Sequence, residues 1–291
     1  MDHQLHWERD EDGVVTLWLR HPGRSVVVID RWLIGQLEAC FDEILRDGPP
    51  TGFALFSRCD RTFVAGADLA EINDLDDDAL ADYLASGLET FARICTLPCP
   101  TVAGIQGAAL GGGLELALHC DAVIAAAPPA NRRPYRVGLP EAGLGLCPGW
   151  GGTQMLPARI DPARAITMMV HGETPAMTDM PDGLFERVVS NEADLFEACH
   201  RWLANHPGAP TRRTPRCIDG SNRGAIAGGL ASVRDDLPDT PAARAIVEAI
   251  EIGLSDGWAA ATAAERRLLI ELRRTDVARE RIAAFFARTS A

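Results

Sequence analysis

Residues 107–117 read GAALGGGLELA, and this stretch carries the strongest local signal in the chain. Its three consecutive glycines, 111–113, predict a tight turn in which the backbone can approach a ligand closely. The run that follows predicts a helix from about residue 112, and the flanking segments 101–106 and 121–126 are predicted strands. A strand, a turn, a helix and a further strand in succession are typical of an α/β core.

The same alternation continues toward the N-terminus. Segments 14–19 and 53–57 are short β-like runs bounded by Gly or Pro. Between them, Asp30 is a predicted helix N-cap. The apolar residues of that helix follow at helical spacing: Leu33, Leu37, Phe41 and Ile44. The acidic stretch 74–78 leads into another predicted helix, whose start it favours because acidic side chains stabilise the positive end of a helix dipole.

The composition changes near residue 206, where the stretch HPGAPTRRTPR is rich in Pro, Gly and Arg and is typical of a linker. We therefore predict an α/β core over 1–205, a linker over 206–220 and a helical region over 221–291. Thr240-Pro241 and Thr275 are predicted helix starts in that region. The apolar residues of its helices are expected to be buried against the core or another subunit: Ile246, Ile250, Leu268, Phe285 and Phe286.

The composition limits what the protein can bind. The 291 residues carry 41 acidic and 28 basic side chains, a net charge of −13, and no Lys is present. The charge argues against nucleic acids and anionic membranes as partners, since both need a basic surface. The absence of Lys excludes Schiff-base catalysis and a P-loop lysine. We expect an anionic ligand to be held by Arg, backbone N–H groups or helix N-termini.

No apolar run is long enough to span a membrane, and the polar, acidic start MDHQLHWERDEDG is unlike a signal or transit peptide. The eight cysteines are scattered, and Cys95 and Cys99 have no partnering Cys or His cluster, so we expect reduced thiols. Together these features predict a soluble cytoplasmic protein. The sequence contains no dinucleotide-binding GxGxxG, no GxSxG nucleophile turn and no metal-ligand spacing, so neither a nicotinamide site nor a metal site is predicted.

Two glutamates are candidate catalytic residues. Glu115 lies in the first turn of the predicted helix, where free N–H groups and the helix dipole can stabilise a carbonyl oxygen that gains negative charge. A Glu in a first turn is also common because it interacts favourably with the dipole. Glu141 lies among Gly and aliphatic residues, where a carboxyl tends to have a raised pKa, but an exposed loop glutamate is the alternative. Both interpretations of each glutamate stay open on the residues alone.

Three motifs occur in a characteristic order: FVAGADL at 63–69, GAALGGGLELALHCD at 107–121 and LPEAGLGLCPGWGGTQ at 139–154. A weaker GLxxxVV follows at 183–189. Together they resemble the enoyl-CoA hydratase/isomerase (crotonase) superfamily. The sequences PGRSVVVID, near residue 22, and VGLPEAGLGLCPGWGG are most similar to the hydratase half of multifunctional fatty-acid oxidation proteins, without the dehydrogenase half.

The resemblance implies a spiral of ββα units, with C-terminal helices that mediate trimer packing or cover the site, and trimers that often pair into hexamers. It implies an acyl-CoA substrate whose thioester oxygen is held by the backbone N–H groups of Ala67 and Gly112. Glu115 and Glu141 would flank a water that adds to C3 of the acyl group, with Glu141 giving a proton to C2. Coenzyme A is part of the substrate, so no metal or redox cofactor is needed, and a separate 3-hydroxyacyl-CoA dehydrogenase is a candidate partner.

The resemblance also implies contacts to coenzyme A from Ala65, Gly66, Asp68 and Leu69. Arg24 is the candidate for a phosphate contact. The sequence departs from the family at Val27, where Asn is common, and at Ala70, where a basic residue is common. The stretch 127–135 lengthens the separation of the two glutamates to 26 residues and is expected to be a surface loop. The motif that the family usually has in this region is only partly retained at 177–188, so the sequence leaves the length of the acyl chain open.

The resemblance favours a 2-enoyl-CoA hydratase, because both Glu115 and Glu141 are retained. An enoyl-CoA isomerase is the first alternative, since one base at Glu141 can shuttle a proton between C2 and C4. Hydrolase and decarboxylase members of the superfamily are further alternatives. A catalytically silent scaffold that binds acyl-CoA or partner proteins is an alternative of another class, which the departures at Val27 and Ala70 support.

Overall fold

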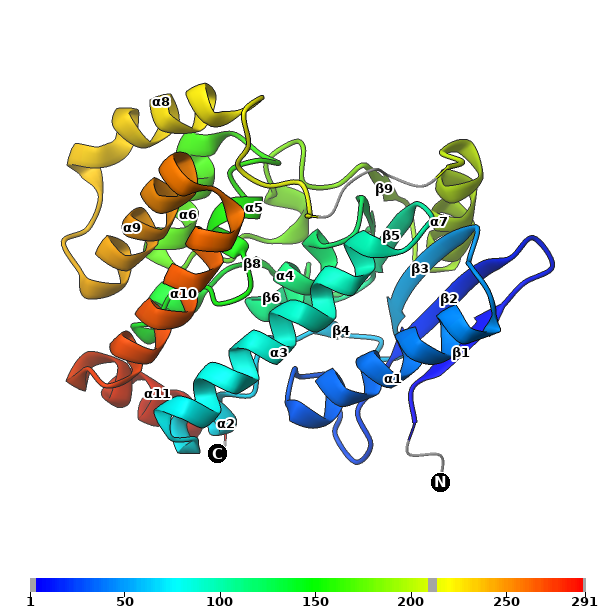
Figure 1. The fold of residues 1–291 in the computed structure, drawn as a ribbon, viewed down its shortest axis with the longest axis horizontal. Helices are drawn as coiled ribbons and strands as arrows, with labels where there is room; N and C mark the ends of the chain where they lie inside the picture. Colours follow the sequence, from blue (N-terminus) through cyan, green and yellow to red (C-terminus); the bar gives the residue numbers. More distant parts are fainter. Residues whose placement is uncertain (1–3, 209–213, 290–291) are drawn as a thin grey trace.

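The computed structural model describes residues 4–208 and 214–289, and it contains two sheets and a group of C-terminal helices (Figure 1). The strands are β1 (His6–Arg9), β2 (Val14–Leu19), β3 (Gly52–Ser57), β4 (Thr62–Val64), β5 (Thr101–Ile105), β6 (Ala108–Leu110), β7 (Ala122–Ala126), β8 (Val137–Gly138) and β9 (Arg187–Val189). The α-helices are α1 (Arg31–Asp47), α2 (Leu69–Asp74), α3 (Asp77–Thr96), α4 (Gly112–Leu118), α5 (Gly152–Met155), α6 (Pro162–His171), α7 (Ala193–Asn205), α8 (Arg223–Val233), α9 (Pro241–Asp256), α10 (Trp258–Arg273) and α11 (Asp276–Thr289). The 3₁₀ helices are η1 (Glu141–Leu144), η2 (Met177–Asp179) and η3 (Arg234–Asp236).

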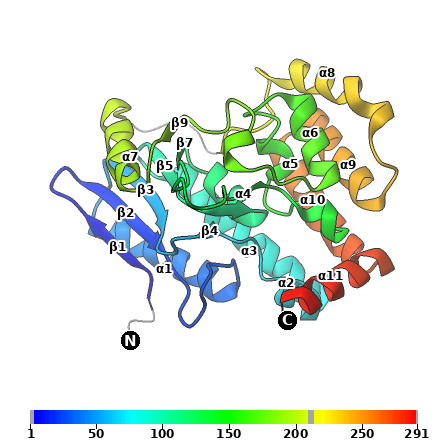
Figure 2. The same cartoon turned by 180° about the vertical axis from the view of Figure 1, so that it is seen from behind.

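The larger sheet has the strand order β1-β2-β3-β5-β7-β9, in which β1 is antiparallel to β2 and the other pairs are parallel. Successive side chains of β3 point to opposite faces, as in any strand. Phe53 and Leu55 therefore belong to the main hydrophobic core, whereas Ala54 and Phe56 pack with α7 on the other face. Figure 2 shows α7 beside this sheet. Both faces are covered, which explains why the parallel strands are almost entirely apolar.

The smaller sheet has the order β4-β6-β8, and all of its strands are parallel. Val64 is paired with Ala109, and Leu110 is paired with Gly138. Because parallel strands end at the same edge of a sheet, the segments that follow these residues meet at one place. Those segments are 65–67, 111–112 and 139–141, which hold the residues that the sequence motifs singled out.

The predicted helix starts are confirmed. Asp30 caps α1, because its Oδ1 accepts a hydrogen bond of 2.8 Å from the Leu33 amide. Thr240 caps α9 in the same way, and Thr275 Oγ1 accepts from the Ala278 amide at the start of α11. α4 begins at Gly112, after Gly111 in the left-handed region with φ of 51°. Glycine suits this position because it has no Cβ to clash there.

The C-terminal helices pack on the α/β part of the chain as well as on one another. α10 contacts α9 and α3, and α9 also contacts α6. Ile246, Ile250 and Leu268 are buried in the main hydrophobic core, so their predicted burial is confirmed within the chain. Phe285 and Phe286 are only half-buried. The predicted linker 206–220 lies partly outside the described residues, and the division into regions remains a prediction.

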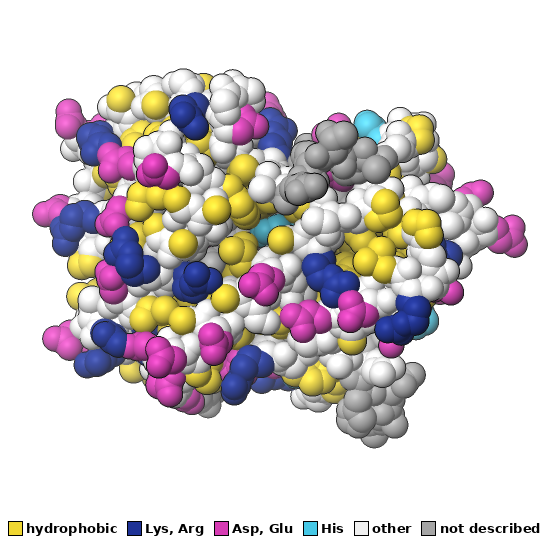
Figure 3. Space-filling view, viewed as in Figure 1, with side chains coloured by type: hydrophobic (Ala, Val, Ile, Leu, Met, Phe, Trp, Pro, Cys, Tyr) yellow, Lys and Arg dark blue, Asp and Glu magenta, His cyan; other side chains and the backbone are white. Residues whose placement is uncertain are grey.

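The surface of the molecule is mixed in charge. Figure 3 shows acidic and basic side chains interspersed over one face, with small hydrophobic areas between them. In the described part of the chain, no helix combines the length and the apolar character that a membrane span requires. Seven of the eight cysteines are buried, and Cys59 is partly exposed. Residues 127–135 form the loop between β7 and β8, and 129–134 are exposed, so the predicted surface loop is confirmed.

Candidate active site

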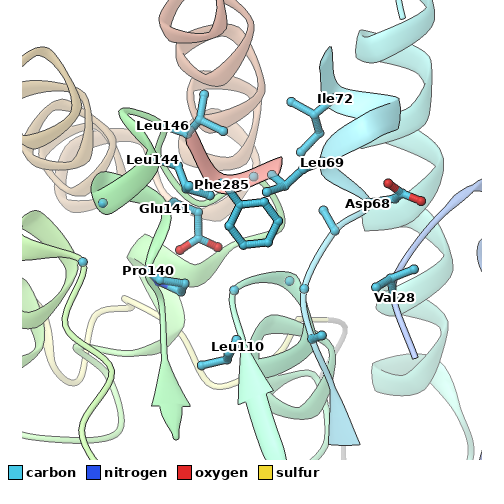
Figure 4. A pocket seen from close by; sticks show the side chains of 18 of the residues that line it. Val28, Asp68, Leu69, Ile72, Leu110, Pro140, Glu141, Leu144, Leu146 and Phe285 are labelled. Carbon is cyan, nitrogen blue, oxygen red and sulfur yellow. The ribbon is translucent and has the colours of Figure 1, made fainter. Parts of the chain in front are cut away.

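A cavity of about 580 Å³ lies at the carboxyl edge of the smaller sheet. Apolar side chains of α2, η1 and α11 form much of its wall, and Figure 4 shows the ring of Phe285 projecting into it between Glu141 and Leu69. Residues of all three motifs line it, among them Ala65, Gly66, Ala67, Asp68, Leu69, Gly111, Gly112, Glu115 and Glu141. Tertiary structure therefore brings residues of all three sequence motifs to one space.

Two residues that line this cavity, Ala67 and Gly112, have backbone N–H groups that the neighbouring strand pairing and helix do not use. Ile29 donates to the Gly66 carbonyl and accepts from the Asp68 amide, at 2.9 and 2.8 Å. In a parallel pairing of this kind, the N–H of the intervening residue, Ala67, points away from the partner strand. Gly112 is the first residue of α4, so its N–H has no acceptor within the helix. Since Val64 and Ala109 are paired, Ala67 and Gly112 each lie three residues beyond that pair.

Glu115 is buried, with 1% of its surface exposed, on the first turn of α4. Its Oε1 accepts hydrogen bonds of 2.8 Å from the amides of Trp150 and Gly152. Burial raises the pKa of Glu115, because it disfavours the charged form, and these two amides oppose the rise. The hydrogen bonds select one orientation of the carboxylate, and they supply donors that an anionic form needs. A first-turn interaction with the dipole is thus not its only role in the structure.

Glu141 begins η1 and reaches back toward the turn before α4. A Cβ on Gly111 would lie 2.5 Å from Glu141 Oε1, so the carboxyl group occupies the space that glycine leaves open. Its Oε2 is buried without a hydrogen-bond partner in the described structure. Burial, followed by the negative charges of Glu115 and Glu265, raises the pKa of Glu141 well above its usual range. The exposed-loop interpretation of Glu141 is therefore wrong, and the carboxyl is suited to hold a proton at neutral pH.

A third carboxylate lies behind the cavity and was not predicted from the sequence. Glu265, on α10, is fully buried and accepts hydrogen bonds from the amides of Gly151 and Thr153. Burial and the charge of Glu115 raise its pKa, and the hydrogen bonds from Thr153 and Gly151 oppose the rise. Along the sequence Glu265 precedes Arg266 and Arg267 on a helix and has no local mark of a buried residue.

Close packing against neighbouring groups explains why α4 begins with glycines. A Cβ on Gly112 would lie 2.3 Å from the ring of Trp150, and a Cβ on Gly113 would lie 2.3 Å from the Val64 carbonyl oxygen. Trp150 Nε1 donates a hydrogen bond of 3.0 Å to the carbonyl oxygen of Leu84 on α3. The glycines therefore allow close packing beneath the site as well as an open space above it.

The predicted coenzyme A contacts divide into two groups. Ala65, Gly66, Asp68 and Leu69 line the cavity. Arg24 does not line it, and its Nη1 donates a 2.7 Å hydrogen bond to Asp68 Oδ2 while Nη2 lies 3.6 Å from Asp30 Oδ2. Two carboxylates, of which Asp68 lines the cavity, thus hold the Arg24 guanidinium. Arg288, on α11, does line the cavity and is a cation that sequence analysis missed.

Two departures from the family motifs also have definite places. Val27 is fully buried, and its neighbours Val26 and Val28 line the cavity instead. Ala70 is exposed, and its amide donates to Asp68 Oδ1 at the N-cap of α2. Among residues 4–208 and 214–289, no group of three His, Cys, Asp or Glu side chains is arranged to hold a metal ion.

We expect Glu141→Gln to raise the melting temperature by more at pH 8 than at pH 5. The raised pKa means that the folded protein keeps a proton on Glu141 that the unfolded chain releases above about pH 4.3. Stability from this proton is present below that pH and is lost as the pH rises toward the raised pKa, by up to about 1.4 kcal/mol per pH unit. The glutamine variant has no ionisable group at this position, so its stability does not fall in this way as the pH rises. Thermal melts of both proteins across this pH range test it, with Glu89→Gln, at an exposed position of α3, as the control.

A pH-independent difference in melting temperature between wild type and Glu141→Gln would contradict the assignment of a buried, proton-holding carboxyl. Glu89→Gln serves as the control because the Glu89 side chain is exposed and lies outside the cavity.

Comparison with known proteins places this geometry in a family. A family model described as enoyl-CoA hydratase/isomerase matches residues 10–210. An enoyl-CoA hydratase of Bacillus anthracis is 26% identical, covers 98% of this chain and 96% of its own, and has a TM-score of 0.62. An enoyl-CoA hydratase of Bacillus halodurans is 19% identical over 96% and 99% of the two chains, with a TM-score of 0.68.

The structure of human mitochondrial delta3-delta2-enoyl-CoA isomerase is similar as well. It is 19% identical over 99% of this chain and 98% of its own, with a TM-score of 0.71. These similarities confirm the expected α/β fold with C-terminal helices. Since the family match spans most of the described α/β part and includes every motif at the cavity, the chain belongs to the enoyl-CoA hydratase/isomerase family of the crotonase superfamily.

Proposed function

We propose that this protein is a 2-enoyl-CoA hydratase, which adds water across the C2–C3 double bond of an acyl-CoA thioester. The observation that carries the proposal is that Glu115, which is buried, and Glu141, which is partly buried, line one cavity but differ in their hydrogen bonds. Two amides stabilise the anionic form of Glu115, whereas a buried oxygen of Glu141 has no donor in the described structure. This difference favours a base at Glu115 and an acid at Glu141.

In the proposed reaction, the N–H groups of Ala67 and Gly112 bind the thioester oxygen. They stabilise the negative charge that develops on this oxygen when C3 is attacked, which is the largest expected contribution to the rate. A water held by the two glutamates gives a proton to Glu115 as its oxygen bonds to C3. Glu141 then gives its proton to C2. The sum is one water added, with the carboxyl groups returned to their starting states by proton exchange.

We also propose that Ala65, Gly66, Asp68 and Leu69 contact the pantetheine part of coenzyme A, because they lie along one wall of the cavity. Arg24 and Arg288 are the proposed partners for its phosphates. For Arg24, the guanidinium has donors left over after its contact with Asp68. We expect the homotrimer or hexamer implied by the family, and a separate 3-hydroxyacyl-CoA dehydrogenase to consume the product.

A spectrophotometric assay with crotonyl-CoA tests the proposal. Hydration removes the conjugated double bond, so the ultraviolet absorbance of the enoyl thioester is expected to fall when enzyme is added. A panel of acyl chain lengths should be assayed for both hydration and double-bond migration. If the protein binds these acyl-CoAs but turns over none of them, the scaffold alternative replaces the hydratase.

Double-bond migration is the second candidate activity. A carboxyl oxygen of Glu141 is buried at the cavity with no hydrogen-bond partner in the described structure, and a single base suffices to move a proton between C2 and C4. The fold similarity to human mitochondrial delta3-delta2-enoyl-CoA isomerase supports keeping this reaction as the second candidate. The two activities predict different responses to substitution of Glu115.

A further inference from the structure

Four consecutive amides, from Trp150 to Thr153, bind two buried carboxylates in alternation. The amides of Trp150 and Gly152 donate to Glu115 Oε1, both at 2.8 Å. The amides of Gly151 and Thr153 donate to Glu265, at 2.6 and 3.0 Å. Successive amides that point to opposite sides of a turn can each hold an anion. The turn is therefore a bridge between a carboxylate at the cavity and one behind it.

Glu265 has an environment that suits a fixed carboxylate. It is fully buried, and Thr153 adds a third hydrogen bond through its hydroxyl. Burying a carboxyl group is unfavourable unless its oxygens are hydrogen-bonded, and here both oxygens have donors. Glu265 does not line the cavity, so it does not touch a substrate placed there. Its contacts instead reach the turn that orients Glu115.

Helix α10 also packs against the turn at residues 150–153 through a second side chain. Gly151 has a φ of 97°, in the left-handed region, and a Cβ there would lie 2.3 Å from the ring of Trp258 at the start of α10. Glu265 thus comes from the helix that packs directly on the turn. The conformation of residues 150–153 depends on α10 through both the hydrogen bonds of Glu265 and the packing of Trp258.

We propose that Glu265 is a positioning residue for catalysis. By binding the amides of Gly151 and Thr153, it holds the turn so that the amides of Trp150 and Gly152 keep the Glu115 carboxylate oriented at the cavity. This inference rests on the proposed acyl-CoA chemistry. It assigns a role in the reaction to the C-terminal helical region, through a residue that contacts no reacting atom.

The charge of Glu265 has a second consequence. The titratable groups that face it or Glu115 are Glu141 from η1, Cys147 from the following loop and His119 from α4. A negative Glu265 disfavours a negative charge on its carboxyl neighbours. Its neutralisation is therefore expected to lower the pKa of Glu141, the proposed acid, and the basic limb of the rate profile should move to lower pH.

The test is Glu265→Gln, measured as kcat, KM and pH dependence with crotonyl-CoA. The glutamine keeps the shape but places an NH₂ group against the amide of Gly151 or Thr153, so the turn loses a hydrogen bond. We expect kcat to fall by about 10- to 100-fold, as for a small displacement of a catalytic group, with KM little changed. We expect the basic limb of kcat/KM to shift to lower pH, because the pKa of Glu141 falls. Glu271→Gln, at an exposed position of α10 paired with Arg267, is the matched control and should resemble the wild type.

A second pair of variants keeps the proposal testable if Glu265→Gln does not fold. Thr153→Val removes the hydroxyl that donates to Glu265, and the hydroxyl is also the acceptor for Gln154 Nε2. Thr153→Ser keeps the hydroxyl. We expect the valine variant to lose more of kcat than the serine variant, and equal losses in the two would overturn the proposal.

The outcomes distinguish a failure of the proposed function from a failure of the proposed role of Glu265. A wild-type protein that turns over no enoyl-CoA overturns the proposed function. A wild type that is active, with Glu265→Gln folded and equal to it in kcat and in pH profile, overturns only the role of Glu265. A folded Glu265→Gln whose loss lies entirely in KM, with the basic limb unmoved, also overturns that role.

Discussion

Glu115→Gln should slow hydration of crotonyl-CoA by about 10²- to 10⁴-fold, and Glu141→Gln should do the same, because each removes one group of a general acid–base pair. Glutamine preserves the shape of the side chain, and it still offers a carbonyl oxygen to the amides of Trp150 and Gly152. Binding of acyl-CoA should therefore survive in both variants. The measurements are kcat and KM by the absorbance assay, with calorimetric titration of a non-reacting acyl-CoA.

The double variant and the choice of substrate distinguish the two candidate reactions. If Glu115 and Glu141 act on one water, the double substitution should cost less than the product of the single effects. For a one-base isomerase, Glu141→Gln should abolish double-bond migration, while Glu115→Gln leaves it largely intact. Glu89→Gln, at an exposed position of α3, is the control for unspecific effects of removing a carboxylate. Full activity in both single variants would refute the catalytic assignment of both residues.

Ala67→Pro should lower kcat by about 10²- to 10³-fold, the effect typical of removing one donor from an oxyanion hole. Proline has no N–H, and the Ala67 amide is not part of the pairing of Ile29 with this segment. The preceding Gly66 has a φ of 107° and tolerates unusual backbone angles. The comparison is Ala67→Gly, which keeps the N–H and should retain far more of the rate. Circular dichroism and a thermal melt establish that each variant is folded.

Substitution of Gly112 is a less selective test of the same hypothesis. Any side chain there meets the Trp150 ring, so loss of activity would combine a missing donor with disturbed packing beneath the site. Ala67 has room for its own Cβ and lies at the rim of the cavity. A folded Ala67→Pro variant with wild-type kcat would show that this amide does not bind the thioester oxygen.

Features with local causes were predictable from the sequence. The N-caps Asp30 and Thr240 each bind an amide three residues later, so the signal and the structure lie within one turn. The start of α4 at Gly112 follows from the glycines at 111–113, because they break the preceding strand and permit the left-handed Gly111. The apolar positions of α1 and α9 follow from helical periodicity.

The residues that line the cavity were predictable only because the three motifs resemble those of a known family. Glu115 and Glu141 are 26 residues apart, and neither one alone separates a catalytic carboxylate from a dipole partner or an exposed loop residue. Sequence analysis identified no separate sheet of β4, β6 and β8, whose short strands have too few residues for a clear alternation. That sheet nonetheless places at one edge the motif segments that follow its three strands.

The sequence by itself determined the fold class, the helix starts and, through its three motifs, the family and two candidate carboxylates. Only the tertiary structure decided that Glu265, which lies 112 residues from Thr153 along the chain, shares the turn that orients Glu115. Glu271 on the same helix has the same residue type and is exposed, so no local pattern separates the two. The difference arises because burial of a carboxylate and the amides it binds depend on which distant segments close around it, and those contacts form only when the chain is folded.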